Sequence, residues 1–267
     1  MELNSSRHGV IIAGGRLVQT AIALISVRIL TSLLSPMQMG RYWLIVSITS
    51  CFALVFVNPV GMYINRRLVE WKGQGSLLEH LDLFAGYLLV VALTASAILF
   101  VLNAFGAFEF QIKTMDLILL VTGSLLFNTA YMTLAPALNF LGKRWWFVSL
   151  NNLALLLGLL LSIGFVHFLS ASAECWLTGQ IASWLAISAI AYWALKNSLP
   201  FRLSEKPRVG SSLSNGIFSS EIFLFSWPLS ITVGLYWLQI SGYRFLLSHL
   251  GDVVSVGLFV TDFGVGA

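Results

Sequence analysis

The sequence predicts an all-α fold, a polytopic bundle of transmembrane helices, on three observations. Of the 267 residues, 58% are hydrophobic and only 10% are charged, and the mean hydropathy is +0.87. A soluble domain could not bury that much apolar surface. The apolar residues also gather into eight stretches separated by polar segments, and most approach the roughly 20 residues that a helix needs to cross a bilayer.

The eight predicted spans follow one another from the N-terminus. The first is not a cleavable signal peptide, because it is long, contains Arg16 and Arg28, and is not followed by a small-residue cleavage site. Ser35-Pro36 separates it from the second span, since proline cannot donate the next helical hydrogen bond. The predicted spans are 10–34, 42–64, 83–102, 115–141, 145–169, 175–195, 222–247 and 253–267.

The spans divide into two predicted units. Residues 1–195 form an N-terminal six-helix lobe, 196–221 a basic cytoplasmic linker containing two prolines, and 222–267 the start of a second lobe. The stretch from Arg28 to Leu34 resembles the stretch from Arg244 to Leu250, which favours a second copy of the first unit, although a chance match is the alternative. Parallel repeats of this kind build transporters with the substrate site between the halves. The eighth span stops at Ala267 without a polar flank, so we expect a truncated chain.

The distribution of lysine and arginine predicts a cytoplasmic N-terminus. With that orientation the cytoplasmic segments hold ten basic residues and the outer loops hold two, Arg41 and Lys113. Short cytoplasmic loops carry the excess of positive charge in membrane proteins. The ten are Arg7, Arg66, Arg67, Lys72, Lys143, Arg144, Lys196, Arg202, Lys206 and Arg208.

Three arginines inside the apolar segments are the main functional clue: Arg16, Arg28 and Arg244. An arginine at a helix centre costs roughly 2.5–3.5 kcal/mol on insertion scales, so it usually faces a water-filled interior. A cationic interior favours the binding or passage of an anion. Gln19 and Thr20 lie near Arg16 and could line the same cavity. The alternative is snorkelling, in which the long side chain reaches the headgroups.

Other polar residues in the spans are weaker candidates. Asn58 precedes Pro59, and Asn139 follows Pro136, so amides and freed carbonyls could together bind sugar hydroxyls, or the prolines could serve packing alone. Asp262, in the eighth span, could pair with an arginine or couple transport to protons.

Nothing in the sequence predicts an enzyme, a metal site or a cofactor. The four histidines are scattered, Cys51 and Cys175 form no CxxC pair, and no catalytic motif is present. The basic residues lie between spans, so the pI of about 9.2 does not indicate nucleic-acid binding.

The sequence resembles the Wzx-type O-antigen flippases, polysaccharide transporters of the MATE-like (MOP) flippase superfamily. The resemblance lies in the N-terminal helix with internal arginines, the run from Arg28 to Pro36 followed by Gly40-Arg41-Tyr42, and the Asn65-Arg66-Arg67 loop. It implies a MATE-like fold in the inner membrane that moves undecaprenyl-diphosphate-linked oligosaccharides to the outer leaflet for lipopolysaccharide or other surface-polysaccharide biosynthesis. It also implies that Arg16, Arg28 and Arg244 form a cationic cavity.

The resemblance further implies that Asp262 is an internal acid of the second bundle, and that polysaccharide polymerase and chain-length proteins are partners. Two other functions stay open. One is a proton- or sodium-coupled exporter of small cations with the same fold, which should need more intramembrane acids. The other is a membrane glycan polymerase, which should have a large outer loop.

Overall fold

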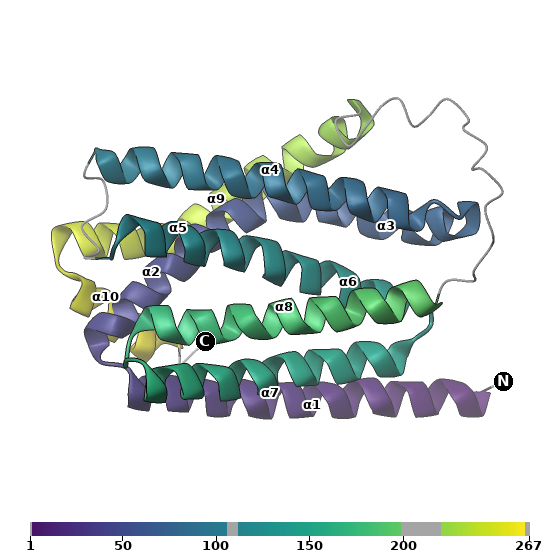
Figure 1. Cartoon of the computed structure of the whole chain (residues 1–267), viewed down its shortest axis with the longest axis horizontal. Coiled ribbons are helices and arrows are strands. Elements are labelled where there is room, and N and C mark those ends of the chain that lie inside the picture. Colours follow the sequence, from purple (N-terminus) through teal and green to yellow (C-terminus); the bar gives the residue numbers. More distant parts are fainter. Residues whose placement is uncertain (1, 106–111, 199–219, 265–267) are drawn as a thin grey trace.

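The computed structural model describes residues 2–105, 112–198 and 220–264, and the side chains of residues 2–11, 220 and 262–264 lie outside the description. Within these ranges every regular element is a helix, as the sequence predicts. The helices run back and forth along the long axis of the molecule (Figure 1).

Eight continuous helical stretches correspond to the eight predicted spans within the described residues. Two of them contain a π-helical turn, and the second stretch continues ten residues beyond the end predicted at residue 64. In chain order the elements are α1 (Glu2–Leu33), α2 (Pro36–Phe52), η1 (Ala53–Val57), α3 (Asn58–Gln74), α4 (Leu77–Ala104), α5 (Thr114–Gly123), η2 (Ser124–Asn128), α6 (Thr129–Phe140), α7 (Arg144–Phe168), α8 (Ala173–Ser198), α9 (Ser220–Leu250) and α10 (Val253–Gly264).

The helix ends follow local chemistry. The Ser35 hydroxyl accepts a hydrogen bond from the backbone N–H of Gln38 at 3.4 Å, and Pro36 occupies the first turn of α2, where its missing N–H is not needed. Gly75 and Gly142 end α3 and α6 with φ of 76° and 82°, which favours glycine. The predicted break at Ser35-Pro36 and the predicted gap between the spans 115–141 and 145–169 are therefore confirmed.

Six helical stretches in the described part of the chain are long and apolar enough to cross a membrane. They are Ile12–Leu33, Pro36–Gln74, Leu77–Ala104, Thr114–Phe140, Arg144–Phe168 and Glu221–Leu250. The fold is therefore compatible with a multi-pass membrane protein. The stretch Pro36–Gln74 has 39 residues and would be about 58 Å long, well beyond the roughly 30 Å hydrocarbon core.

Helices α8 and α10 do not meet the same criterion. Helix α10 has 12 residues. Helix α8 is more polar, and its serines are used within the bundle, where the Ser183 hydroxyl donates to the carbonyl of Ala154 at 2.8 Å. A Cβ at Gly179 would overlap the backbone of Ser162, so α7 and α8 approach closely. Helix α8 nevertheless keeps exposed apolar side chains, including Leu185 and Trp193.

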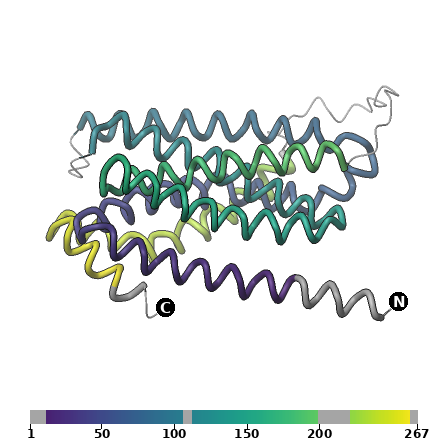
Figure 2. Tube along the Cα trace, turned by 60° about the horizontal axis from the view of Figure 1, so that its bottom comes forward, coloured from purple at the N-terminus to yellow at the C-terminus, as the bar shows by residue number. Residues whose placement is uncertain are grey.

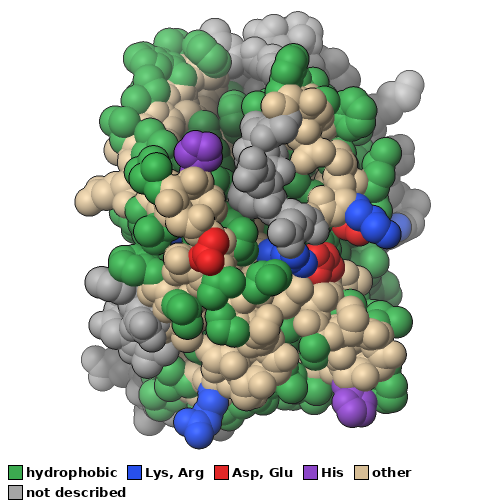
Figure 3. Space-filling view, turned by 90° about the vertical axis from the view of Figure 1, so that its left-hand side faces the viewer, with side chains coloured by type: hydrophobic (Ala, Val, Ile, Leu, Met, Phe, Trp, Pro, Cys, Tyr) green, Lys and Arg blue, Asp and Glu red, His purple; other side chains and the backbone are tan. Residues whose placement is uncertain are grey.

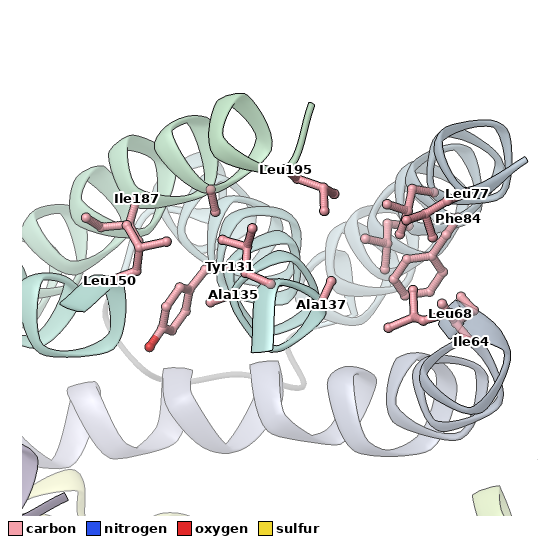
Figure 4. Packing of buried hydrophobic residues seen from close by; sticks show 14 of the residues in the cluster. Ile64, Leu68, Leu77, Phe84, Tyr131, Ala135, Ala137, Leu150, Ile187 and Leu195 are labelled. Carbon is pink, nitrogen blue, oxygen red and sulfur yellow. The ribbon is translucent and has the colours of Figure 1, made fainter. Parts of the chain in front are cut away.

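The buried apolar side chains form three clusters. The largest joins α3, α4, α6, α7 and α8, and Figure 4 shows Leu68, Phe84 and Leu150 within it. A second joins α2, α4 and α5 to Val256 and Val260 of α10. The third is formed mainly by α1, α2, α7 and α8.

Helices α9 and α10 attach to the rest of the molecule mainly through the stretch Pro36–Gln74. Helix α10 packs on α2, and α9 packs on α2, η1 and α3. A Cβ at Gly257 would overlap the carbonyl oxygen of Pro36, and one at Gly40 would overlap that of Val253, so the two backbones touch. Helix α1 lies along one edge of the bundle, with α7 as its main neighbour (Figure 2).

Candidate functional site

Arg244 lies on α9 and reaches into α2. Its Nη1 donates a hydrogen bond to the Ser47 hydroxyl at 2.8 Å. Its guanidinium also lies over the rings of Trp43 and Tyr243, 5.1 and 5.6 Å from their centroids. Arginine suits such a site because its planar group can stack and donate hydrogen bonds together. The side chain is half-buried rather than directed into bulk solvent.

Further polar contacts join the same faces of α2 and α9. The Trp237 Nε1–H lies 3.0 Å from the Ser47 carbonyl oxygen and 3.1 Å from the Ser50 hydroxyl. Residues 43, 47 and 50 lie three or four positions apart, so they share one face of α2, and residues 237 and 244 share one face of α9. We call Trp43, Ser47, Ser50, Trp237 and Arg244 the α2–α9 seam.

The charge of Arg244 is not neutralised within the described part of the chain. The two ion pairs found there both involve Arg67. The partners of Arg244 are the hydroxyls of Ser47 and Tyr243 and two aromatic faces, which orient the guanidinium without cancelling its charge. In surroundings of low dielectric constant such a cation attracts an anion more strongly than it would in water.

An open hollow of about 700 Å³ lies along the second half of α9 and is lined by residues of that helix alone. Its lining is mostly apolar and aromatic, with a few polar groups. The lining residues are Trp237, Leu238, Gln239, Gly242, Tyr243, Phe245, Leu246 and His249.

Arg16 lies exposed on α1, close to a second polar group. It interacts electrostatically with the Tyr131 side chain of α6, and the Tyr131 hydroxyl donates a hydrogen bond to Oδ1 of Asn151 on α7. A Cβ at Gly15 would overlap the Val148 side chain, so the glycine permits the close approach of α1 to α7. Tyr131 is buried, with its hydroxyl at the edge of the apolar cluster (Figure 4).

Arg28 is exposed farther along α1. Among the described residues its guanidinium forms no hydrogen bond or ion pair. Gln19 is half-buried on the same helix. The Thr20 hydroxyl donates to the Arg16 carbonyl at 3.0 Å, so its proton serves its own helix. Helix α1 therefore carries two exposed cations on a largely apolar surface.

The remaining predicted residues are spread over other elements. Asn58 is exposed at the start of α3, directly after the π-helical turn η1. Asn139 is half-buried at the end of α6, where its carbonyl accepts from the Gly142 N–H at 3.0 Å. The side chain of Asp262 lies outside the described residues. The hypothesis of one cavity shared by all of these residues stays a prediction.

The end of the bundle where α9 meets α10 carries few charged side chains (Figure 3). Asp252, between these helices, accepts a hydrogen bond from the Ser255 N–H at 2.7 Å. Hydrogen bonds from the Ser255 side chain and backbone hold the pKa of this carboxyl below its usual range. Asp252 therefore caps α10 electrostatically.

Sequence reasoning missed the contact between α3 and α9 at the opposite end of the bundle. Arg67 donates to Glu221 at 2.7 Å although 154 residues separate them. The charges alone gave no signal for this pair. No group of three or more metal-ligating side chains occurs in the described ranges.

The chain has no significant match among protein-family models, curated protein sequences or solved structures. Its fold and charges define a class: an all-α bundle with apolar helices long enough to cross a membrane and with cations among them.

Proposed function

We propose that the protein is a flippase for undecaprenyl-diphosphate-linked oligosaccharides, the repeat units of O-antigen or another surface polysaccharide. The observation that carries the proposal is the placement of three arginines in apolar helices without acidic partners among the described residues. Arg16 and Arg28 are exposed on α1, and Arg244 is oriented by Ser47 and Trp43. A diphosphate is the anion that matches such groups best, because arginine can bind phosphate oxygens with two parallel hydrogen bonds.

In this mechanism the arginines hold the diphosphate while the polyprenyl tail stays in the lipid. Arg16 and Arg28 are 12 residues apart, or about 18 Å along α1. The negative charge of a diphosphate headgroup could therefore pass from one arginine to the other and keep a cationic partner on the way. The helices of the two lobes would rock about the central site, as in other transporters built from repeats. The open hollow along the second half of α9 would contact the sugars.

The same proposal places the protein in the cell inner membrane with its N-terminus in the cytoplasm. The excess of Lys and Arg in the segments assigned to that side supports this orientation. Polysaccharide polymerase and chain-length proteins would act on the product at the outer leaflet and are proposed partners.

The test is the pool of lipid-linked glycan in cells that lack the gene for this chain. We expect single repeat units on undecaprenyl diphosphate to accumulate at the inner leaflet and surface polysaccharide to be lost. Repeat units that reach the outer leaflet but stay unpolymerised would instead indicate a polymerase. An unchanged pool would contradict both functions and leave the exporter of small cations.

A further inference from the structure

Helix α9 contacts α3 near its start and α2 farther along, and the two ends of this interface are held by different kinds of contact. At the end where α9 meets α10, the anchor is α10 itself, whose backbone touches that of α2 at Gly257 and Gly40. At the end where α9 begins, the contact is made by long charged and aromatic side chains. The first arrangement resists separation, because small-residue packing leaves no room to rearrange.

The contact combines ion pairs with aromatic contacts. Arg67 of α3 forms ion pairs with Glu221 of α9 and with Glu70 of its own helix, both at 2.7 Å. The Arg66 guanidinium lies 4.9 Å from the centroid of the Phe225 ring. Tyr63 packs edge-on against Phe225, with centroids 5.7 Å apart. We call Tyr63, Arg66, Arg67, Glu221 and Phe225 the α3–α9 latch.

The latch is suited to opening and closing. The Arg67 and Glu221 side chains are 37% and 62% exposed, and ion pairs in such surroundings are worth little net stability. When α9 moves away, Arg67 keeps its bond to Glu70, so its charge is not left without a partner. Glu221 passes into solvent, which solvates it well.

A π-helical turn lies between the two ends of the interface. The π-helical turn η1, Ala53–Val57, separates α2 from α3 and is followed by Pro59. π-Helical turns and prolines are common causes of bends in helices. The Tyr87 hydroxyl of α4 donates to the Phe56 carbonyl at 2.7 Å, satisfying an acceptor in the turn.

We propose that the α3–α9 latch is a releasable gate, and that α9 swings about its fixed contact with α2 and α10 when the latch opens. Opening would separate the ends of α3 and α9 and leave the α2–α9 seam closed. The idea that this opening admits the glycan headgroup rests on the proposed flippase function, whereas the latch itself is a property of the helices and can be tested without a substrate.

The test uses single cysteines as reporters of separation, in a chain with Cys51→Ser and Cys175→Ser. Ser226→Cys reports on the latch, because Ser226 follows Phe225, is 8% exposed, and its hydroxyl has no hydrogen-bond partner among the described residues. Ser241→Cys reports on the other half of α9 and is a matched control, since Ser241 is 5% exposed on the same helix. The rate of maleimide labelling is measured on the purified chain in detergent, where both ends are accessible.

We expect Arg67→Glu or Glu221→Arg alone to raise the labelling rate of Ser226→Cys at least about fivefold, since each replaces an attraction by a repulsion. The double variant should restore the rate to within about twofold, because it rebuilds the pair with the charges exchanged. Labelling of Ser241→Cys should not change, and neither should either rate in the control variant Lys72→Glu.

Two results would overturn the latch. One is a Ser226→Cys rate that is unaffected by single reversals or not restored by the double variant. The other is a parallel rise at Ser241→Cys, which would indicate that α9 detaches or unfolds as a whole. Because the readout needs no glycan, a failed latch and a failed flippase function give separate results.

Discussion

A single arginine can carry two properties that the proposed flippase site needs, a fixed position and an uncompensated charge. Among the described residues Arg244 has both, because the Ser47 hydroxyl and the Trp43 ring orient its guanidinium and neither carries a negative charge. A lysine at this position would keep the charge and lose the planar stacking. The comparison of alanine and lysine variants therefore separates charge from orientation.

We expect Arg244→Ala to lower delivery of repeat units to the outer leaflet about 10- to 100-fold, since a hydrogen bond to a charged group is worth about 1.5–3 kcal/mol. Arg244→Lys should give an intermediate loss. The measurement is surface polysaccharide in deleted cells that express each variant at equal levels. Lys113→Ala, in a loop, is the matched control and should behave as the unsubstituted chain does. Full activity of Arg244→Ala would remove this residue from the site.

A helical stretch stays continuous through a π-helical turn or a proline when other groups hydrogen-bond the backbone atoms left without a helical partner. Asn58-Pro59 interrupts the backbone hydrogen bonding of the second span, and the structure places the π-helical turn η1 just before it. A π-helical turn changes the register of the backbone hydrogen bonds, and here the Tyr87 hydroxyl serves the Phe56 carbonyl. The turn is thus held by a residue on a different helix.

Tyr87→Phe should destabilise the bundle by about 1 kcal/mol, because it removes the donor to a backbone carbonyl and leaves the aromatic packing in place. Thermal unfolding in detergent measures the loss. Tyr192→Phe, at an exposed tyrosine of α8, is the control and should leave the unfolding temperature unchanged. Equal unfolding temperatures for both variants would show that the turn does not need the Tyr87 hydroxyl.

The start of α10 should depend on pH through Asp252. Its pKa is lowered in the folded state by the hydrogen bonds from Ser255, so the cap is fully formed above the usual carboxyl pKa. The stabilisation is lost as the pH falls through the lowered value. Hydrogen exchange of the first α10 amides, corrected for intrinsic rates, should lose protection over that window. Asp252→Asn should abolish the pH dependence, and a persistent dependence would assign it to another group.

At the scale of the whole molecule, hydropathy predicted which parts of the chain form helices and their order. The bilayer requires each span to satisfy its own backbone, so apolar length alone indicates a helix. Hydropathy failed where a helix continues into polar sequence, as α3 does through Arg66, Arg67, Glu70 and Lys72 to Gln74. These residues favour helices, so α3 does not end where its apolar surface ends.

The contacts between distant segments were not predictable in the same way. The sequence predicts Arg244 to be an intramembrane cation, but its partner Ser47 is 197 residues away and resembles many other serines in the predicted spans. Pairing depends on which helix faces touch, and hydropathy carries no such information. The α3–α9 latch and the α2–α9 seam therefore required the three-dimensional arrangement.

The orientation of the bundle decides which side of the membrane the latch would open to. Ser170, between α7 and α8, and Gly73, near the end of α3, are exposed, and a side chain at Gly73 would meet no neighbour. The α7–α8 connection and the end of α3 lie at opposite ends of the molecule (Figure 1). In a chain with Cys51→Ser and Cys175→Ser, an impermeant maleimide should label Ser170→Cys in intact cells and Gly73→Cys only in opened ones. This follows from the basic residues concentrated near Gly73. The reverse pattern would place the N-terminus outside and the latch at the outer surface, where it could release a glycan but could not admit one from the cytoplasm.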